Sequence, residues 1–158
     1  MNSIPKHLQA GVRNKTGTYK FEKDEIISFA RKYDPQYFHT DEEAAQNSLF
    51  GGLCASGWHT IAVWMKMQRA FTAEKLKQYE AEGLPIPEFG PSPGIRELKW
   101  LKPVYAGDAI TYFTETTNIR QSNSKPGWSI TTQINSAYNQ NDEQVLSFIG
   151  TVFIKLPQ

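Results

Sequence analysis

The sequence predicts an α+β fold in which one curved antiparallel sheet wraps around a single long helix. Two observations carry this prediction. Residues 57–81 have helical periodicity, and the first half of this segment is apolar on nearly all sides, which is typical of a buried helix. After residue 94 the chain has segments in which apolar and polar residues alternate, and three turns separate these segments. Strands joined in this way pair antiparallel.

Composition limits the domain count and the classes of partner. The chain has 158 residues, 39% hydrophobic and 21% charged, which predicts a single globular domain over 1–158 with a polar, irregular segment at 1–16. A net charge of +1 offers no electrostatic basis for binding nucleic acid or a membrane surface. With one cysteine and no long apolar run, we expect a cytoplasmic protein without a membrane span.

The N-terminal half predicts a strand and two helices before the central one. Residues 16–34 read as a short strand followed by a helix that begins at Lys23 or Asp24 and ends at Asp34, because Pro35 disfavours helical geometry at the residue before it. A second short helix is expected to begin at Thr40, since Thr40 and Glu43 have capping-box spacing.

The central helix is predicted to run from an N-cap at Ser56 to about Ala81, with Gly83 as its stop. Its first half carries two apolar faces, both expected to be buried: Trp58, Ile61, Ala62 and Met65 on one, and Val63, Trp64, Met67, Ala70 and Phe71 on the other. After Thr72 the helix becomes charged and must emerge into water. The proline-rich residues 84–94 are predicted to be a loop.

Four strands are predicted to follow, at residues 95–104, 108–119, 130–138 and 145–156. In the third, Ile130, Ile134 and Tyr138 alternate with polar residues on the other face. A curved sheet around an apolar helix is the hot-dog architecture, and the alternative is an α+β sandwich with the helix on a flatter sheet.

The most informative short stretch is DPQYFH, which places Asp34 and His39 five positions apart between two helices. One interpretation is a helix-terminating turn with a surface histidine. The other is an acid–base pair, partly desolvated by Tyr37 and Phe38 so that its pKa values approach neutrality. The start of the central helix follows closely, and its free amides at Ser56 and Gly57 suit a developing oxyanion.

Other reactive groups carry less weight. The three histidines lack metal-ligand spacing, so we expect no metal and no cofactor. Cys54 is interpreted as a small buried residue and His59 as a core histidine. An acid, an imidazole and an oxyanion site are the groups needed to add or remove water across a carbon–carbon double bond next to a carbonyl.

The spacing of these residues resembles the MaoC-like dehydratases, which include R-specific enoyl-CoA hydratases with the hot-dog fold. That family has an Asp, a His five positions later and an Asp-x-x-Ala helix start, matched here by Asp34, His39, Asp41 and Ala44 or Ala45. Gly57 falls at the glycine that opens the family's central helix, and KPVYAGD at 102–108 resembles a later turn. Two departures stand out: the proline lies directly after Asp34, and Ser56 replaces the histidine of a His-Gly pair.

The resemblance implies a hydro-lyase acting on a 2-enoyl-CoA thioester of fatty acid metabolism. Asp34 and His39 would be catalytic, with Asp34 favoured as the base. Ser56 and Gly57 would bind the substrate, the Gly57 amide holding the thioester oxygen. It also implies a homodimer or a dimer of dimers. A hot-dog acyl-CoA thioesterase and a non-catalytic acyl-CoA-binding protein remain the alternatives.

Overall fold

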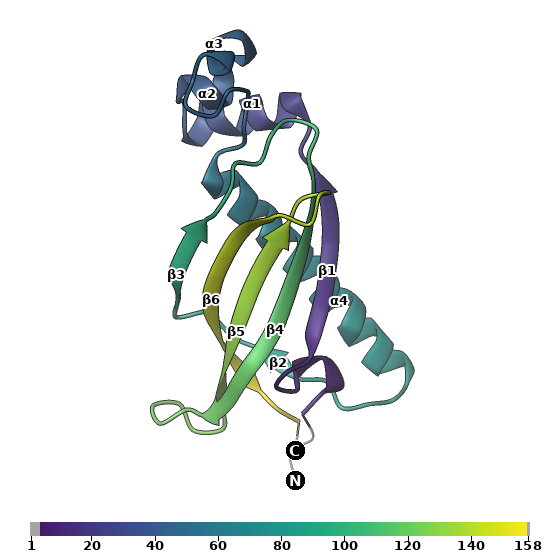
Figure 1. The fold of residues 1–158 in the computed structure, drawn as a ribbon. Coiled ribbons are helices and arrows are strands. Elements are labelled where there is room, and N and C mark those ends of the chain that lie inside the picture. The colour runs from purple at the N-terminus through teal and green to yellow at the C-terminus, as the bar shows by residue number, and fades with distance from the viewer. Residues whose placement is uncertain (1–3, 158) are drawn as a thin grey trace.

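A six-stranded antiparallel sheet curls around the helix α4 (Gly57–Ala81) in the computed structural model, which describes residues 4–157. The order β1-β4-β5-β6 forms the body of the sheet, and β2 and β3 both pair with β6 at its edge. Figure 1 shows α4 running diagonally across one face of the sheet. The predicted hot-dog fold is therefore confirmed. The strands are β1 (Arg13–Lys20), β2 (Glu88–Phe89), β3 (Gly94–Trp100), β4 (Ala109–Gln121), β5 (Ser129–Tyr138) and β6 (Gln144–Lys155).

Three short helices gather beyond one end of the sheet, where α4 also begins (Figure 1). They are α1 (Lys23–Tyr33), α2 (Tyr37–Thr40) and α3 (Glu42–Gln46). The predicted helix start at Thr40 is wrong, because Thr40 ends α2 and its hydroxyl donates to the Gln36 carbonyl. Asp41 caps α3 instead, accepting a hydrogen bond from the Ala44 amide.

Two other boundaries differ from the predictions. Residues 1–16 were expected to be irregular, yet the short 3₁₀ helix η1 (Lys6–Leu8) forms and β1 begins at Arg13, where it pairs with Glu115 of β4. The loop 84–94 contains β2, and β3 ends at Trp100, ahead of Pro103, which has no amide hydrogen for a sheet.

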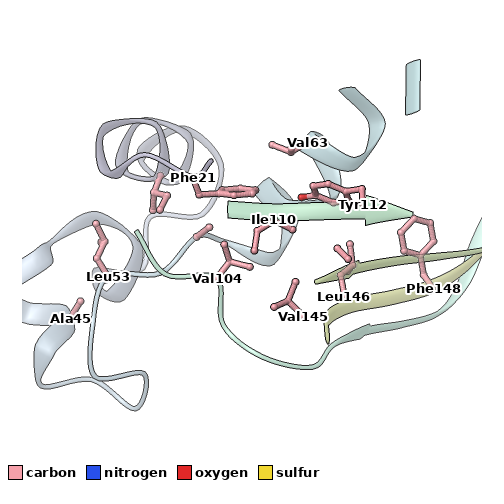
Figure 2. Packing of buried hydrophobic residues seen from close by; sticks show 13 residues of the cluster. Phe21, Ala45, Leu53, Val63, Val104, Ile110, Tyr112, Val145, Leu146 and Phe148 are labelled. Carbon is pink, nitrogen blue, oxygen red and sulfur yellow. The ribbon is translucent and has the colours of Figure 1, made fainter. Parts of the chain in front are cut away.

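The core lies between the start of α4, the helical cluster and the inner face of β4 and β6 (Figure 2). The Tyr112 hydroxyl on β4 donates to the Thr60 carbonyl over 2.8 Å, which ties the first turn of α4 to the sheet. The Trp64 indole on α4 donates to the side-chain oxygen of Asn135 on β5 over 3.1 Å. These bonds hold the N-terminal half of α4 in place. Among the described residues, no helix is both long and apolar enough to cross a membrane.

The described residues cover only one side of α4. Val63 is buried, as predicted, but Trp58 is 57% exposed and Met65 is 46% exposed, and Ala62 between them is also exposed. The prediction that both apolar faces are buried is therefore wrong for this face. One curved sheet can wrap only part of a helix, and the other face of α4 has no cover within residues 4–157.

The strand β5 turns its polar side inward. Thr131, Gln133 and Asn135 are buried and face α4, whereas Ile134 on the opposite face is 43% exposed. The register explains the direction, since Asn135 pairs with Phe148 and Ala137 with Leu146, which are both core residues of β6. The inner wall of the sheet beside α4 is thus partly built from amides and hydroxyls.

Candidate active site

A cavity of about 520 Å³ opens at the N-terminus of α4. Its walls come from the turn between α1 and α2, the start of α4 and the segment that follows β3. Asp34, His39 and Gly57, three of the residues singled out in the sequence, all line it. We call this space the site cavity.

Local structure explains why Asp34 and His39 face one another. Asp34 caps the C-terminus of α1, with its amide bonded to the Ala30 carbonyl, and Pro35 prevents the helix from continuing. The single turn of α2 then carries His39 back towards the core. The distance between His39 Nε2 and Asp34 Oδ2 is 3.5 Å. The five-residue spacing therefore produces a contact pair.

Asp34 is held by two further side chains. The Ser56 hydroxyl donates to Oδ2 over 2.7 Å, and the Gln36 amide donates to Oδ1 over 2.8 Å. Partial burial alone would raise the pKa of Asp34, but these two hydrogen bonds and the neighbouring His39 outweigh it and lower the pKa below its ordinary value. Asp34 is therefore a carboxylate at neutral pH.

His39 is buried and fixed in one orientation. Its Nδ1 lies 2.6 Å from the Cys54 carbonyl oxygen, an acceptor, so Nδ1 carries the hydrogen and donates it. In the neutral imidazole, Nε2 then presents its lone pair towards Asp34 and the cavity. Phe38 packs edge-on against the imidazole at 4.6 Å and shields it. Tyr37, expected to do the same, is mostly exposed and contacts Phe38 instead.

The start of α4 presents a free backbone donor. The amides of Trp58, His59 and Thr60 bond to Ser56, whereas the Gly57 amide has no acceptor among the described residues. Gly57 lines the site cavity. Ser56 does not line it, because this residue is fully buried and its hydroxyl is engaged with Asp34 and the Trp58 amide. Ser56 therefore supports the Asp34 carboxylate.

The surroundings of Cys54 and His59 agree with the structural interpretation of both residues. Burial, with the charge of Asp34 nearby, raises the pKa of the Cys54 thiol to about 11, so it stays protonated. His59 is buried and stacked on Phe29 at 4.5 Å, and its Nδ1 has no hydrogen-bond partner. Burial lowers the pKa of His59, which favours the neutral ring expected of a core histidine.

Sequence reasoning missed three partners of the site. Gln36 lies inside the DPQYFH stretch, but nothing in its type indicates that it turns back to Asp34. The contact of His39 with Cys54 uses a backbone carbonyl, which has no signature in the sequence. Trp100 comes from β3, far along the chain, and its indole covers Gly57 so closely that a Cβ there would lie 2.4 Å from the ring.

Comparisons with known proteins identify the family. The MaoC-like domain model matches residues 7–138, and the chain belongs to this family. The YdeM protein of Bacillus subtilis strain 168, described as uncharacterized, is 31% identical over 141 residues, covering 89% of this chain and 91% of YdeM. The crystal structure of a MaoC-like dehydratase from Rhodospirillum rubrum has a TM-score of 0.78 and 35% identity, covering 96% of this chain and 95% of that one.

A more distant structure has the same fold. The (R)-hydratase from A. caviae involved in PHA biosynthesis has a TM-score of 0.63 and 20% identity, covering 97% of this chain and all of that one. At this identity the likeness concerns the fold. The protein is thus a hot-dog member of the MaoC-like dehydratase family.

Proposed function

We propose that this protein is a hydro-lyase that adds water across, or removes it from, the double bond of a 2-enoyl thioester of coenzyme A. One observation carries the proposal: Asp34 and His39 meet at 3.5 Å in a cavity whose wall includes the free amide of Gly57. Membership of the MaoC-like family supports the reaction class.

The pair would hold one water molecule between Asp34 and His39 Nε2. Asp34 accepts the proton of this water as its oxygen attacks C3 of the enoyl group. A proton is delivered to C2 on the same face, with His39 orienting the water and passing the proton. General acid–base catalysis of this kind contributes roughly 10²- to 10⁴-fold. The lowered pKa of Asp34 keeps the carboxylate ionised and available at neutral pH.

The Gly57 amide would bind the thioester oxygen as negative charge develops on it. It is the first amide of a 25-residue helix, so the partial positive charge of the helix terminus adds to the hydrogen bond. Losing one such donor typically costs about 10²- to 10³-fold in rate. The backbone supplies this group, which is compatible with Ser56 in place of a histidine beside it.

The test is the loss of enoyl absorbance when the protein is mixed with crotonyl-CoA. We expect hydration by the wild type, and a loss of about 10²-fold or more in both Asp34→Asn and His39→Ala. Glu43→Gln, which changes an exposed acid on α3, serves as the matched control and should keep wild-type activity.

Near-full activity in Asp34→Asn would contradict this mechanism. Release of free thiol without hydration would instead identify a thioesterase, which uses activated water on the carbonyl carbon. Binding of acyl-CoA with neither reaction would identify a non-catalytic binding protein.

We further propose a homodimer formed through the uncovered face of α4. Trp58, Ala62, Met65 and Arg69 are exposed and lie within one narrow stripe of the helix. The neighbouring edge strand β3 adds Ile95 and Trp100, which are also exposed. A second copy would cover both features at once, and we call them together the assembly surface.

A further inference from the structure

A second cavity, of about 200 Å³, lies further along α4 between the helix and the sheet. Its walls include three amide side chains, Gln68 on α4 and Gln133 and Asn135 on β5. We call it the amide chamber. Gly150 of β6 leaves the space open, because a Cβ at this position would lie 3.2 Å from Asn135 Nδ2. The proline-rich loop adds Phe89 and Gly90 to the wall.

The amide side chains of this chamber are incompletely paired. Gln133 is only 8% exposed, yet within residues 4–157 its side-chain amide makes no hydrogen bond. The buried side-chain oxygen of Gln68 has no partner either. Asn135 accepts from the Trp64 indole through its side-chain oxygen and donates one amide hydrogen to the Gln133 carbonyl, which leaves one hydrogen for another acceptor. Unpaired buried polar groups are costly and therefore call for a partner.

The chamber and the site cavity lie one after the other along α4. Thr60 lines the site cavity and Trp64 lines the chamber, so one turn of α4 separates them. Trp64 and Gln68 are seven and eleven residues beyond Gly57, or roughly 10 and 16 Å along the helix axis. An acyl chain that has its thioester oxygen at Gly57 and extends along α4 would bring its distal end to the chamber.

The hydrogen-bonding groups of the chamber walls determine which end group of an acyl chain fits there. A hydrocarbon end would leave the amides of Gln133 and Gln68 unpaired. A carboxylate accepts only and brings a full negative charge, and among the described residues of the wall Arg69 is the sole charged one to meet it. A hydroxyl both donates and accepts, so it can pair with the Gln68 oxygen and a Gln133 or Asn135 amide hydrogen together.

We propose that the amide chamber binds a hydroxyl group at the distal end of the acyl chain, so that hydroxyl-bearing 2-enoyl thioesters are preferred over plain hydrocarbon ones. This inference rests on the proposed function and specifies its substrate class. Gln133 is the principal specificity-determining residue, because its side-chain amide lines the chamber and has no hydrogen-bond partner within residues 4–157.

The experiment uses a length series of 2-enoyl-CoA thioesters, each in a methyl-ended and a hydroxyl-ended form. Once the chain is long enough to reach the chamber, we expect kcat/KM to favour the hydroxyl-ended form by about 10- to 100-fold. Gln133→Leu should remove or reverse that preference. Thr132→Val, on the opposite face of the same strand, is the matched control and should keep it.

Folding and catalysis are checked separately. Thermal unfolding of Gln133→Leu should occur at or above the wild-type temperature, since leucine fills the space without an unpaired amide. Calorimetric binding of saturated methyl-ended and hydroxyl-ended acyl-CoA should show the same preference without turnover. This measurement tests the chamber even if crotonyl-CoA is not hydrated, a result that would count against the proposed function alone.

Equal kinetics and equal binding of the two forms at every length would overturn the inference and leave a chamber filled by water. A preference for carboxylate-ended chains would also overturn it, in favour of a site governed by Arg69. Either result would leave hydration of short enoyl-CoA, and hence the proposed function, intact.

Discussion

At Gly57 the backbone and the Trp100 indole lie closer together than a side chain would allow. A glycine at this position lets a ligand carbonyl approach the amide closely. The structure adds a second reason, because the space beside the Gly57 α-carbon is already occupied by Trp100. Trp100 in turn packs edge-on against Trp58 at 5.3 Å. The two indoles thus form a wall of the site cavity next to the free amide.

Gly57→Ala tests this packing. The new methyl group would lie 2.4 Å from the ring, so Trp100 must move, and overpacking of this kind costs about 1–3 kcal/mol. We expect a lower unfolding temperature, changed tryptophan fluorescence and about tenfold or greater loss of the proposed hydratase activity. Gly52→Ala is the matched control, since its methyl group would meet the Tyr105 ring at an ordinary 3.6 Å. Wild-type fluorescence in Gly57→Ala would show that the indole does not sit over this residue.

Among the elements, η1 and the last turns of α4 depend on each other. His7 of η1 is buried, packs against Phe71 and Tyr79 of α4, and its Nδ1 lies 2.6 Å from the Tyr79 hydroxyl. Burial, with the nearby charge of Lys75, lowers the pKa of His7 to about 4. The charged half of α4 emerges into water, as expected, except where η1 packs against it. We call the contact of His7 with Phe71 and Tyr79 the clamp.

This clamp predicts a dependence of stability on pH. The pKa of an unfolded histidine is about 6.5, so between pH 6.5 and 4 the unfolded chain binds a proton at His7 that the folded chain does not. The free energy of unfolding should then fall as the pH is lowered through this window, by up to about 1.4 kcal/mol per pH unit.

His7→Asn should flatten that slope, because asparagine offers a nitrogen at the position of Nδ1 without titrating. The measurement is urea unfolding at a series of pH values for both proteins. His59, whose pKa is also lowered by burial, leaves a residual slope in the variant. Identical slopes in the two proteins would contradict the role given to His7.

At the scale of the whole molecule, one face of α4 has no cover within residues 4–157. Met65 lies near the middle of the assembly surface and is 46% exposed. If a second copy covers it, Met65→Glu would bury an unpaired charge, so we expect a shift from dimer to monomer in sedimentation velocity.

Leu49→Glu provides the control for this experiment. Leu49 is the most exposed of the large hydrophobic residues but lies in the turn after α3, away from the assembly surface, so its substitution should leave the dimer intact. A wild-type protein that sediments as a monomer would overturn the proposed dimer. A dimer that persists in Met65→Glu would place the interface elsewhere.

The residue pattern within short segments was sufficient to predict much of this fold. The periodicity of residues 57–81, the Ser56 cap and the strand–turn spacing after residue 94 predicted α4 and the sheet, because these signals depend on residues close in sequence. The Asp34–His39 pairing could also be anticipated, since Pro35 ends α1 and one turn of α2 is enough to bring the two side chains together.

Contacts between distant segments decided the features that the sequence pattern could not predict. Which face of β5 turns inward follows from its register with β6, and that register buries Gln133 and Asn135 while exposing Ile134, the reverse of a simple apolar-inside rule. Likewise, Trp100 reaches Gly57 and the Cys54 carbonyl reaches His39 only because the sheet and helices close on one another. The sequence by itself determined the main elements and the contact between Asp34 and His39, because these arise from neighbouring residues. The surroundings of the pair and the polar chamber beyond it depend on contacts between distant segments, and only the folded chain brings these segments together.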